Sequence, residues 1–261
     1  MLDIPIITYH KISNRKEFGL TTVSKHKFET QMKYLYSHGY NTIRLKDLSQ
    51  EAKLPEKPVI ITFDDGYENI YLNAIPVLKK YNFKAVIFIV ANYIGHYNTW
   101  EAMQFQQKYM HLTEDQIRRL RDDGHEIGSH SKMHNHLPTL SGNKLIDEIK
   151  GSKIKLEKLL DKKISSFCYP YGRFNEKIVN LVKEAGYRYA TTNLKYDNKK
   201  NFNPFTLNRR SIYMTDSQNI FISKIKSQNT LNISYLTESI IQKGSIASIG
   251  LNILQRTKSN F

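Results

Sequence analysis

The chain has 261 residues, of which 40% are hydrophobic and 24% are charged, and it contains 17 Tyr and 12 Phe. This length and composition indicate a folded globular protein of one or two domains, and they exclude a disordered chain, collagen and a coiled coil. The single cysteine, Cys168, cannot form an internal disulfide. Lys and Arg number 39 against 24 Asp and Glu, which gives a formal net charge of +15.

This excess of positive charge suits a partner with dense negative charge, such as nucleic acid, an anionic membrane surface or an acidic glycan. Lysine is spread along the chain without a block of about five or six basic residues, which favours a solvated, lysine-rich surface. The first residues lack the basic region of a signal peptide, and no run of about 18 apolar residues is present. We therefore expect a cytoplasmic protein, or a secreted or surface protein if a leader has been removed.

Short apolar runs alternate with longer amphipathic segments along the chain, which is typical of a parallel α/β sheet. Ser24 and Asn175 are suited to cap helices, and Thr113 with Gln116 forms a capping box. The expected strands cover residues 5–9, 59–63, 85–90, 126–129, 166–169, 188–191 and 206–213, and the expected helices cover residues 24–39, 70–78, 113–124, 146–160 and 175–185. These six or seven βα units over about 215 residues predict one β/α barrel.

The βα alternation stops after residue 215. From residue 216 onward the pattern predicts two weak helices with several Lys and Arg side chains, including Lys224, Lys243 and Arg256. We therefore expect a barrel domain over residues 1–215 and a small basic C-terminal helical appendage over residues 216–261.

Three polar motifs follow directly after expected strands. They are Asp64-Asp65-Gly66, the pair His130 and His134, and Tyr169-Pro170-Tyr171-Gly172. Because the carboxyl ends of parallel strands meet at one end of a barrel, we expect these motifs to lie close together.

Two adjacent carboxylates after a buried strand are costly unless they are paired or bind a metal. Neighbouring residues of an extended chain point to opposite sides, so Asp64 and Asp65 are expected to differ in task. One can bind a metal while the other takes a proton. The alternative is a polar turn in which one Asp caps the next helix.

His130 and His134 are four residues apart, so that in a helical turn both rings fall on one face and can hold one ion. Two solvated histidines are the alternative for this pair taken alone. With an Asp from another strand end, the pair completes an Asp/His/His set that leaves a place for water, as in a catalytic zinc site.

The three motifs, in this order, resemble those of the polysaccharide deacetylases, the NodB-homology group or carbohydrate esterase family 4. The resemblance covers roughly residues 1–215 and implies an α/β fold, a distorted (β/α)7-type barrel. It also implies an enzyme that removes acetyl groups from amino sugars with one divalent metal. Zinc is the usual metal, with Co, Ni, Mn or Fe as alternatives. By this resemblance Asp64 is the general base, and the metal ligands are Asp65, His130 and His134.

The resemblance also implies roles for residues outside the metal centre. The backbone N–H of Tyr171 is expected to help hold the oxyanion. Residues expected to bind substrate are Tyr169, Pro170, Gly172 and Leu207. Trp100 is a candidate platform for a sugar ring, with ordinary packing as the alternative.

The chain departs from the commonest family pattern at two places. Cys168 and Tyr169 stand where many members have an arginine and a proline, and Arg209 stands where many supply a histidine as the general acid. The subgroup of biofilm poly-N-acetylglucosamine deacetylases resembles this chain more closely, because its acid is a histidine after the first strand, which His10 matches. Arg209 is then expected to reach Asp64, with Arg210 as the rival, and a purely structural His10 is the alternative to the acid.

The expected function is metal-dependent hydrolysis of the N-acetyl group of an N-acetylhexosamine glycan. One alternative is deacetylation or deformylation of a lipid-linked sugar at the cytoplasmic membrane face, with the basic C-terminal region contacting the membrane. An alternative from another class is a catalytically silent carbohydrate-binding barrel. A glycosidase is disfavoured because its two carboxylates must face each other across a sugar, whereas the adjacent residues Asp64 and Asp65 diverge. No nucleic-acid partner is expected, because the net charge is the only feature that would support one.

Overall fold

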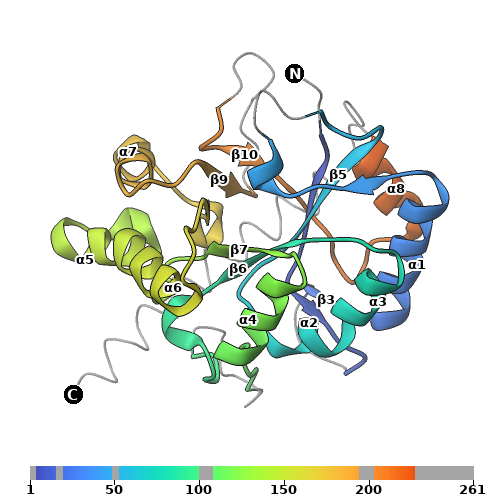
Figure 1. Cartoon of the computed structure of the whole chain (residues 1–261), viewed down its shortest axis with the longest axis horizontal. Coiled ribbons are helices and arrows are strands. Elements are labelled where there is room, and N and C mark those ends of the chain that lie inside the picture. Colours follow the sequence, from blue (N-terminus) through green and yellow to red (C-terminus); the bar gives the residue numbers. More distant parts are fainter. Residues whose placement is uncertain (1–3, 16–19, 49–52, 100–107, 194–202, 227–261) are drawn as a thin grey trace.

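The computed structural model describes residues 4–15, 20–48, 53–99, 108–193 and 203–226. Its centre is a sheet of parallel strands in the order β10-β9-β8-β7-β6-β5-β1-β11. Helices pack around this sheet, with α1, α3 and α8 on one side and α5 to α7 on the other (Figure 1). The strands are β1 (Ile6–Tyr9), β5 (Pro58–Phe63), β6 (Val86–Ile89), β7 (Glu126–Ser129), β8 (Ser166–Cys168), β9 (Tyr189–Thr192), β10 (Leu207–Asn208) and β11 (Arg210–Ser211).

The sheet curves into a nearly closed ring at Arg209. This residue is the only one between β10, which pairs with β9, and β11, which pairs with β1 at the other end of the strand order. The backbone N–H of Arg209 donates to the carbonyl of Thr192 at 2.9 Å. The arrangement confirms the expected distorted β/α barrel, in which β10 and β11 together fill one position.

Three further strands were not expected from the sequence. Strand β4 (Asn41–Thr42) pairs with the beginning of β5, while β2 (Lys11–Ile12) and β3 (Thr22–Val23) form a separate parallel pair. Each has only two residues, which is too short for alternation of apolar and polar side chains to be recognised.

The helices confirm the expected caps. Ser24 accepts a hydrogen bond from the N–H of Lys27, Thr113 and Gln116 form the capping box, and Asn175 accepts from the N–H of Ile178. The helix expected over residues 70–78 is divided in two at Ala74, and the one over 146–160 contains a π-helical turn. The helices are α1 (Lys25–Ser37), α2 (Glu68–Asn73), α3 (Ile75–Lys80), α4 (Glu114–Asp122), α5 (Gly142–Ile146), the π-helical turn η5 (Asp147–Gly151), α6 (Ser152–Leu160), α7 (Glu176–Glu184) and α8 (Gln218–Lys226).

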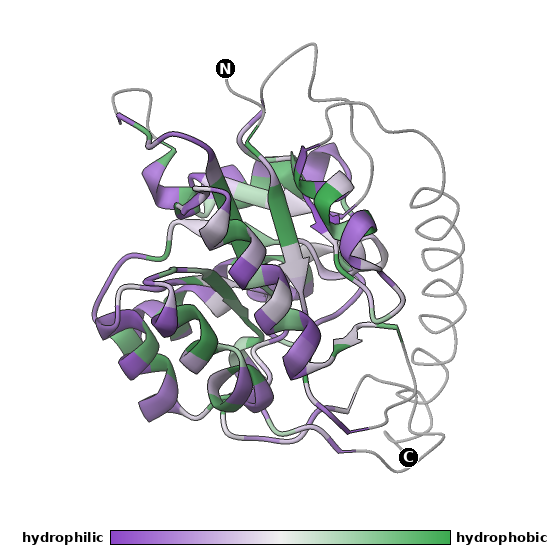
Figure 2. Ribbon diagram, turned by 90° about the vertical axis from the view of Figure 1, so that its right-hand side faces the viewer, coloured by the Kyte–Doolittle hydropathy of each residue, from purple (hydrophilic) through white to green (hydrophobic). Residues whose placement is uncertain are grey.

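Alternation along the strands creates two apolar layers. Ile6, Ile60 and Phe88 belong to a cluster inside the ring, whereas Ile7 and Ile61 belong to the larger cluster under the helices. Hydrophobic residues accordingly concentrate on the central strands (Figure 2). This burial of both sheet faces supplies the main stabilisation of a parallel sheet.

Gly128 in β7 shows how tightly the interior of the ring is filled. A Cβ at this position would lie 2.5 Å from the Phe88 ring and 2.7 Å from Ser166 Oγ. Any larger residue here would therefore displace the neighbouring strands just below the site.

Helix α8 is the described part of the predicted C-terminal appendage. Its residues Phe221 and Ile225 are buried in the main core, and Lys224 is buried in an ion pair with Asp216 at 2.7 Å. The domain boundary at residue 215 stays a prediction, and Lys243 and Arg256 lie outside the described residues. Within the described ranges, no helix has the length and apolarity needed to cross a membrane.

Candidate active site

The candidate site forms because five polar side chains point to the inside of the ring. They occupy positions that match the inward-facing residues of the alternating strands. His10, Asp64 and His130 each come directly after a strand, in register with the inward residues of that strand, while Cys168 ends β8 and Arg209 joins β10 to β11. Side chains of a strand alternate with a period of two, and parallel strands end at one edge. The carboxyl end of the ring is therefore the place where these groups meet, as expected.

Asp64 and Arg209 form a bidentate ion pair. Arg209 Nη1 donates to Asp64 Oδ1 and Nη2 donates to Oδ2, both at 2.6 Å, and the side chains are only 3% and 1% exposed. Arg209 Nε donates to Asn193 Oδ1 at 3.0 Å, and Nη1 also donates to Thr62 Oγ1 at 3.1 Å. The guanidinium is thus held by Asn193, which follows β9, and by Thr62 of β5.

This pair fixes the charge of the carboxylate. Burial alone would raise the pKa of Asp64, but the charge and hydrogen bonds of Arg209 outweigh burial and hold that pKa well below its usual range. Arg209 is therefore the partner of Asp64, as predicted. The rival, Arg210, donates instead to the carbonyl of Lys224.

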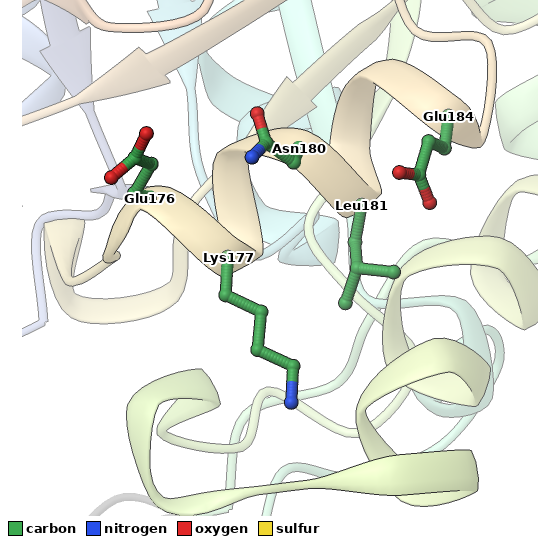
Figure 3. Close-up of a pocket in the computed structure, with 5 residues that line it drawn as sticks. All are labelled: Glu176, Lys177, Asn180, Leu181 and Glu184. Atoms are coloured by element: carbon green, nitrogen blue, oxygen red, sulfur yellow. The ribbon is translucent and has the colours of Figure 1, made fainter.

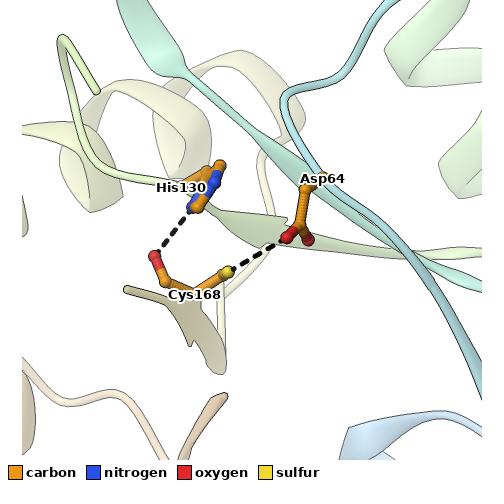
Figure 4. A group of neighbouring side chains, drawn as sticks. All are labelled: Asp64, His130 and Cys168. Atoms are coloured by element: carbon orange, nitrogen blue, oxygen red, sulfur yellow. Dashed lines mark hydrogen bonds between the residues drawn. The ribbon is translucent and has the colours of Figure 1, made fainter. Parts of the chain in front are cut away.

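Cys168 lies beside Asp64 and His130 and forms a hydrogen bond with each (Figure 4). Its thiol donates to Asp64 Oδ2 at 3.7 Å and accepts from Arg209 Nη2 at 3.1 Å, and its carbonyl accepts from His130 Nδ1 at 2.8 Å. Complete burial, with Asp64 acting in the same direction, raises the pKa of the thiol well above its usual value despite Arg209. Cys168 is therefore a neutral packing residue here, because a thiol without access or thiolate character is a poor nucleophile.

Asp65 faces the two histidines because its backbone turns out of the strand. Its φ of 69° lies in the left-handed region, so that its side chain does not follow the alternation of β5. Asp65 Oδ1 lies 3.5 Å from His130 Nε2 and 3.5 Å from His134 Nε2. Asp64 and Asp65 do have different partners, but the extended backbone on which that prediction rested is absent at Asp65.

The two histidines reach this carboxylate through a loop. The prediction of a helical turn is wrong: residues 130–135 contain no helix, and both Ser131 and His134 have positive φ, 65° and 56°. The loop is tightened by Ser131 Oγ, which accepts from the N–H of His134 at 3.0 Å. The pair converges through tertiary structure and not through helical periodicity.

Asp65, His130 and His134 fit one divalent metal ion. Bonds of about 2.0–2.2 Å in a tetrahedron place the ligand atoms roughly 3.4 Å apart. The distance from Asp65 Oδ1 to each histidine Nε2 is close to this, at 3.5 Å, and ligand atoms of all three residues lie within 4.8 Å of one another. The bond from His130 Nδ1 to the carbonyl of Cys168 leaves its Nε2 available as a ligand atom. Nitrogen and carboxylate ligands suit zinc and also other transition metals.

His10 completes the polar wall beside Asp64. Its Nε2 lies 4.0 Å from Asp64 Oδ2, and its side chain remains 21% exposed. Burial lowers the pKa of His10 to about 4, although the Asp64 carboxylate acts in the opposite direction. The resting ring is therefore neutral at pH 7, so the predicted acid must first receive a proton.

Tyr171 is the member of its motif that faces the histidines. Its ring centroid lies 4.7 Å from that of His134, and its backbone has a φ of 58°. Pro170 and Gly172 are buried beside it, where the Gly172 carbonyl accepts from Thr192 Oγ1 at 2.8 Å. These two residues shape the loop at the edge of the site.

Two residues expected to bind substrate have side chains in the core. Tyr169 is 1% exposed, stacks on Phe174 and donates to the carbonyl of Phe205, while Leu207 is 5% exposed inside the ring. Direct contact of either side chain with a substrate does not fit this burial. Strand alternation places Tyr169 beneath the helices, a direction that the motif alone did not reveal. Trp100 lies outside the described residues.

His111 is a site residue that the sequence did not indicate. Its Nδ1 is 2.9 Å from the carbonyl of Asp65, and the residue is only 2% exposed. A carbonyl oxygen can only accept, so Nδ1 carries the proton and donates. Burial lowers the pKa of His111 to about 4. No motif surrounds His111, and 46 residues separate it from Asp65, so only the tertiary structure identifies the contact.

A surface pocket lies apart from these residues. It is lined by a single helix, α7, with Glu176, Lys177, Asn180, Leu181 and Glu184 (Figure 3). None of the five belongs to the candidate site, and four of them are exposed. We therefore place the chemistry at the end of the ring and not in this pocket.

Comparison with known proteins identifies the family. The polysaccharide deacetylase family model matches residues 36–190, which include both carboxylates, both histidines and the Tyr169 motif. The chain belongs to the polysaccharide deacetylase family. The family resemblance read from the motifs is thereby confirmed.

Individual relatives agree with this assignment. Protein YxkH of Bacillus subtilis (strain 168), provisionally named a polysaccharide deacetylase, is 36% identical over 193 residues, 72% of this chain and 64% of its own length. A poly-beta-1,6-N-acetyl-D-glucosamine N-deacetylase of Staphylococcus aureus (strain MSSA476) is 31% identical over 68% of this chain and 63% of its own length. The match thus spans just under two thirds of these relatives.

A solved structure shows the same fold. The polysaccharide deacetylase BC0361 from Bacillus cereus superposes with a TM-score of 0.72 at 28% identity, over 85% of this chain and 69% of BC0361. Because 85% of the chain is covered, the likeness extends beyond residues 36–190.

Proposed function

We propose that this polysaccharide deacetylase hydrolyses the N-acetyl group of an N-acetylhexosamine glycan with the help of one divalent metal ion. The set of metal ligands favours zinc. The observation that carries the proposal is the convergence of two separate carboxylate systems at one end of the ring. Asp64 is held by Arg209, and Asp65 joins two histidines. A carbohydrate-binding module has no need for a metal triad beside a base, so this convergence favours an enzyme.

In the reaction, water adds its oxygen to the acetyl carbon, the carbon–nitrogen bond breaks, and the departing nitrogen takes a proton. The products are acetate and a free amino sugar. The metal held by Asp65, His130 and His134 supplies Lewis acidity toward the carbonyl and toward water. The remaining work falls to side chains that orient the substrate and move protons.

Asp64 is the base in this proposal. Arg209 holds it ionised with both oxygens in fixed positions, so that it accepts a proton without first reorienting. In the proposal His10 receives that proton and donates it to the departing nitrogen, and the 4.0 Å from its Nε2 to Asp64 Oδ2 supports this role. The backbone N–H of Tyr171 stabilises the developing oxyanion, an interaction whose loss typically costs about 10²–10³ in rate.

The substrate class is supported by the relatives. Proteins named poly-beta-1,6-N-acetyl-D-glucosamine N-deacetylase are 31% identical to this chain. We therefore propose poly-N-acetylglucosamine as the first glycan to test. A lipid-linked sugar at a membrane stays the alternative: in the described part of the basic C-terminal region, Lys224 is buried against Asp216, whereas Lys226 is exposed.

A paired substitution separates the two carboxylate systems. We expect Asp65→Ala to abolish stoichiometric zinc binding and acetate release, whereas Asp64→Asn keeps zinc bound and abolishes acetate release only. Zinc content is measured by metal analysis, and acetate release is measured on poly-β-1,6-N-acetylglucosamine oligomers. Wild-type protein that carries one zinc yet releases no acetate from N-acetylated glycans would refute the proposed activity.

A further inference from the structure

The loop that carries His134 has a conformation that its own sequence does not favour. Ser131 and His134 both have positive φ, which is costly for residues other than glycine. Such residues persist only where surrounding structure holds them in place. The contacts around this loop therefore decide whether its histidines are positioned for a metal.

One side of the loop is held by backbone groups. The N–H of Ala91 donates to the carbonyl of Ser131 at 3.1 Å, and the N–H of Asn92 donates to the carbonyl of Lys132 at 2.9 Å. These contacts satisfy the carbonyls of the loop but leave its amides to other partners.

The other side is held by one buried carboxylate, Glu148. Its Oε2 accepts from the backbone N–H of Lys132 at 3.1 Å and of Met133 at 3.0 Å, and its Oε1 accepts from Asn135 Nδ2 at 2.7 Å. Glu148 is only 4% exposed. Three hydrogen bonds to a buried carboxylate form a stronger and more directional clamp than neutral partners provide.

The π-helical turn η5 brings this carboxylate to the loop. Glu148 and its neighbour Asp147 are consecutive, yet both contact the loop, since Asp147 pairs with Lys132 Nζ at 2.8 Å. In an α-helix consecutive side chains point about 100° apart. Short π-helical turns often occur at functional sites, and this one carries both carboxylates that contact the loop, Glu148 through backbone N–H groups and Asp147 through the Lys132 side chain.

We infer that Glu148 is a positioning residue that holds the His130–His134 loop in its metal-binding conformation before the metal arrives. It touches neither metal nor substrate and acts through the backbone between the two histidines. The inference deepens the proposed function, on which it rests for the identity of the ligands. It adds a residue that none of the three motifs contains.

The first test measures zinc affinity. Glu148→Ala is expected to weaken zinc binding about 10–100-fold, the usual effect of losing a residue that orients metal ligands. Glu148→Gln keeps one acceptor oxygen and is expected to show a smaller loss. The matched control is Asp147→Asn, which removes only a partly exposed pair with the Lys132 side chain and is expected to change zinc affinity by less than about twofold. Affinities are measured by chelator competition on protein shown to be folded by circular dichroism.

The second test needs no variant. Hydrogen exchange of the Lys132 and Met133 amides is compared in zinc-free and zinc-loaded wild-type protein. If Glu148 holds the loop beforehand, both amides are protected without zinc. Fast exchange of both amides until zinc is added would overturn the inference, as would wild-type zinc affinity in folded Glu148→Ala protein. If Glu148→Ala does not fold, the zinc affinity of Glu148→Gln and the amide exchange of the wild-type protein decide whether the inference holds.

These outcomes are distinct from failure of the proposed function. Protein that binds zinc, responds to Glu148 substitution and releases no acetate retains the inference and loses the activity. Protein that binds no zinc at all loses the proposed function, while protected Lys132 and Met133 amides still support the role of Glu148.

Discussion

The ion pair of Asp64 and Arg209 offers the most direct test of how this site is built. Arg209→Met replaces the guanidinium with an apolar side chain that can occupy the same buried space. The substitution removes two charge-assisted hydrogen bonds of 2.6 Å and leaves the carboxylate, 3% exposed, without its cation. We expect a large loss of stability because the remaining charge stays buried.

The magnitude follows from two independent estimates. A hydrogen bond to a charged group contributes about 1.5–3 kcal/mol, so two such bonds contribute about 3–6 kcal/mol. Removing one partner of a buried ion pair typically costs about 3–5 kcal/mol. For a protein of this size each kcal/mol lowers the melting temperature by about 2–4 °C, so a decrease of about 6–20 °C is expected.

The assay is urea unfolding in the presence of a chelator, so that metal binding does not contribute. Arg209→Met, Asp64→Asn and the double variant form a cycle with the wild type. We expect the double variant to be clearly more stable than the sum of the single losses predicts, because it leaves no unpaired charge. Strict additivity, or an Arg209→Met variant within about 1 kcal/mol of the wild type, would refute this account of the pair.

Three further outcomes concern the partly exposed His10 and the buried Cys168 and His125. His10→Gln is expected to lower the turnover of acetate release at least about 10²-fold with zinc content unchanged, and equal turnover would remove its proton-transfer role. Cys168, buried with a raised pKa, should resist a thiol reagent in folded protein and react after unfolding, so rapid labelling at neutral pH would contradict its packing role. Burial lowers the pKa of His125 to about 4, below its unfolded value of about 6.5, so between these pH values the unfolded chain binds the extra proton. The free energy of unfolding then falls by up to about 1.4 kcal/mol per pH unit on acidification. The His125→Asn variant should lose this contribution to the pH dependence of stability, which is measured by urea unfolding between pH 7 and pH 5. The charged groups acting on His125 are Lys84, Asp123 and Arg44.

The sequence determined where the ring strands lie, but not the two-residue strands β2, β3 and β4, and it determined the main helix caps and the end of the ring where polar groups gather. Apolar runs of four to six residues identify buried parallel strands, and residues such as Ser24 and Thr113 cap helices through contacts only three residues away. These features are local, so they are visible without the fold.

Tertiary structure alone decided how the proposed metal ligands, Asp65, His130 and His134, meet. Asp65 turns inward through a left-handed backbone, and His134 reaches it through a strained loop instead of a helical turn. The residues that hold these conformations, His111 and Glu148, lie 46 and about 15 residues away in the chain and belong to no recognisable motif. Their contribution depends on hydrogen bonds between distant backbone segments, which a linear pattern does not encode.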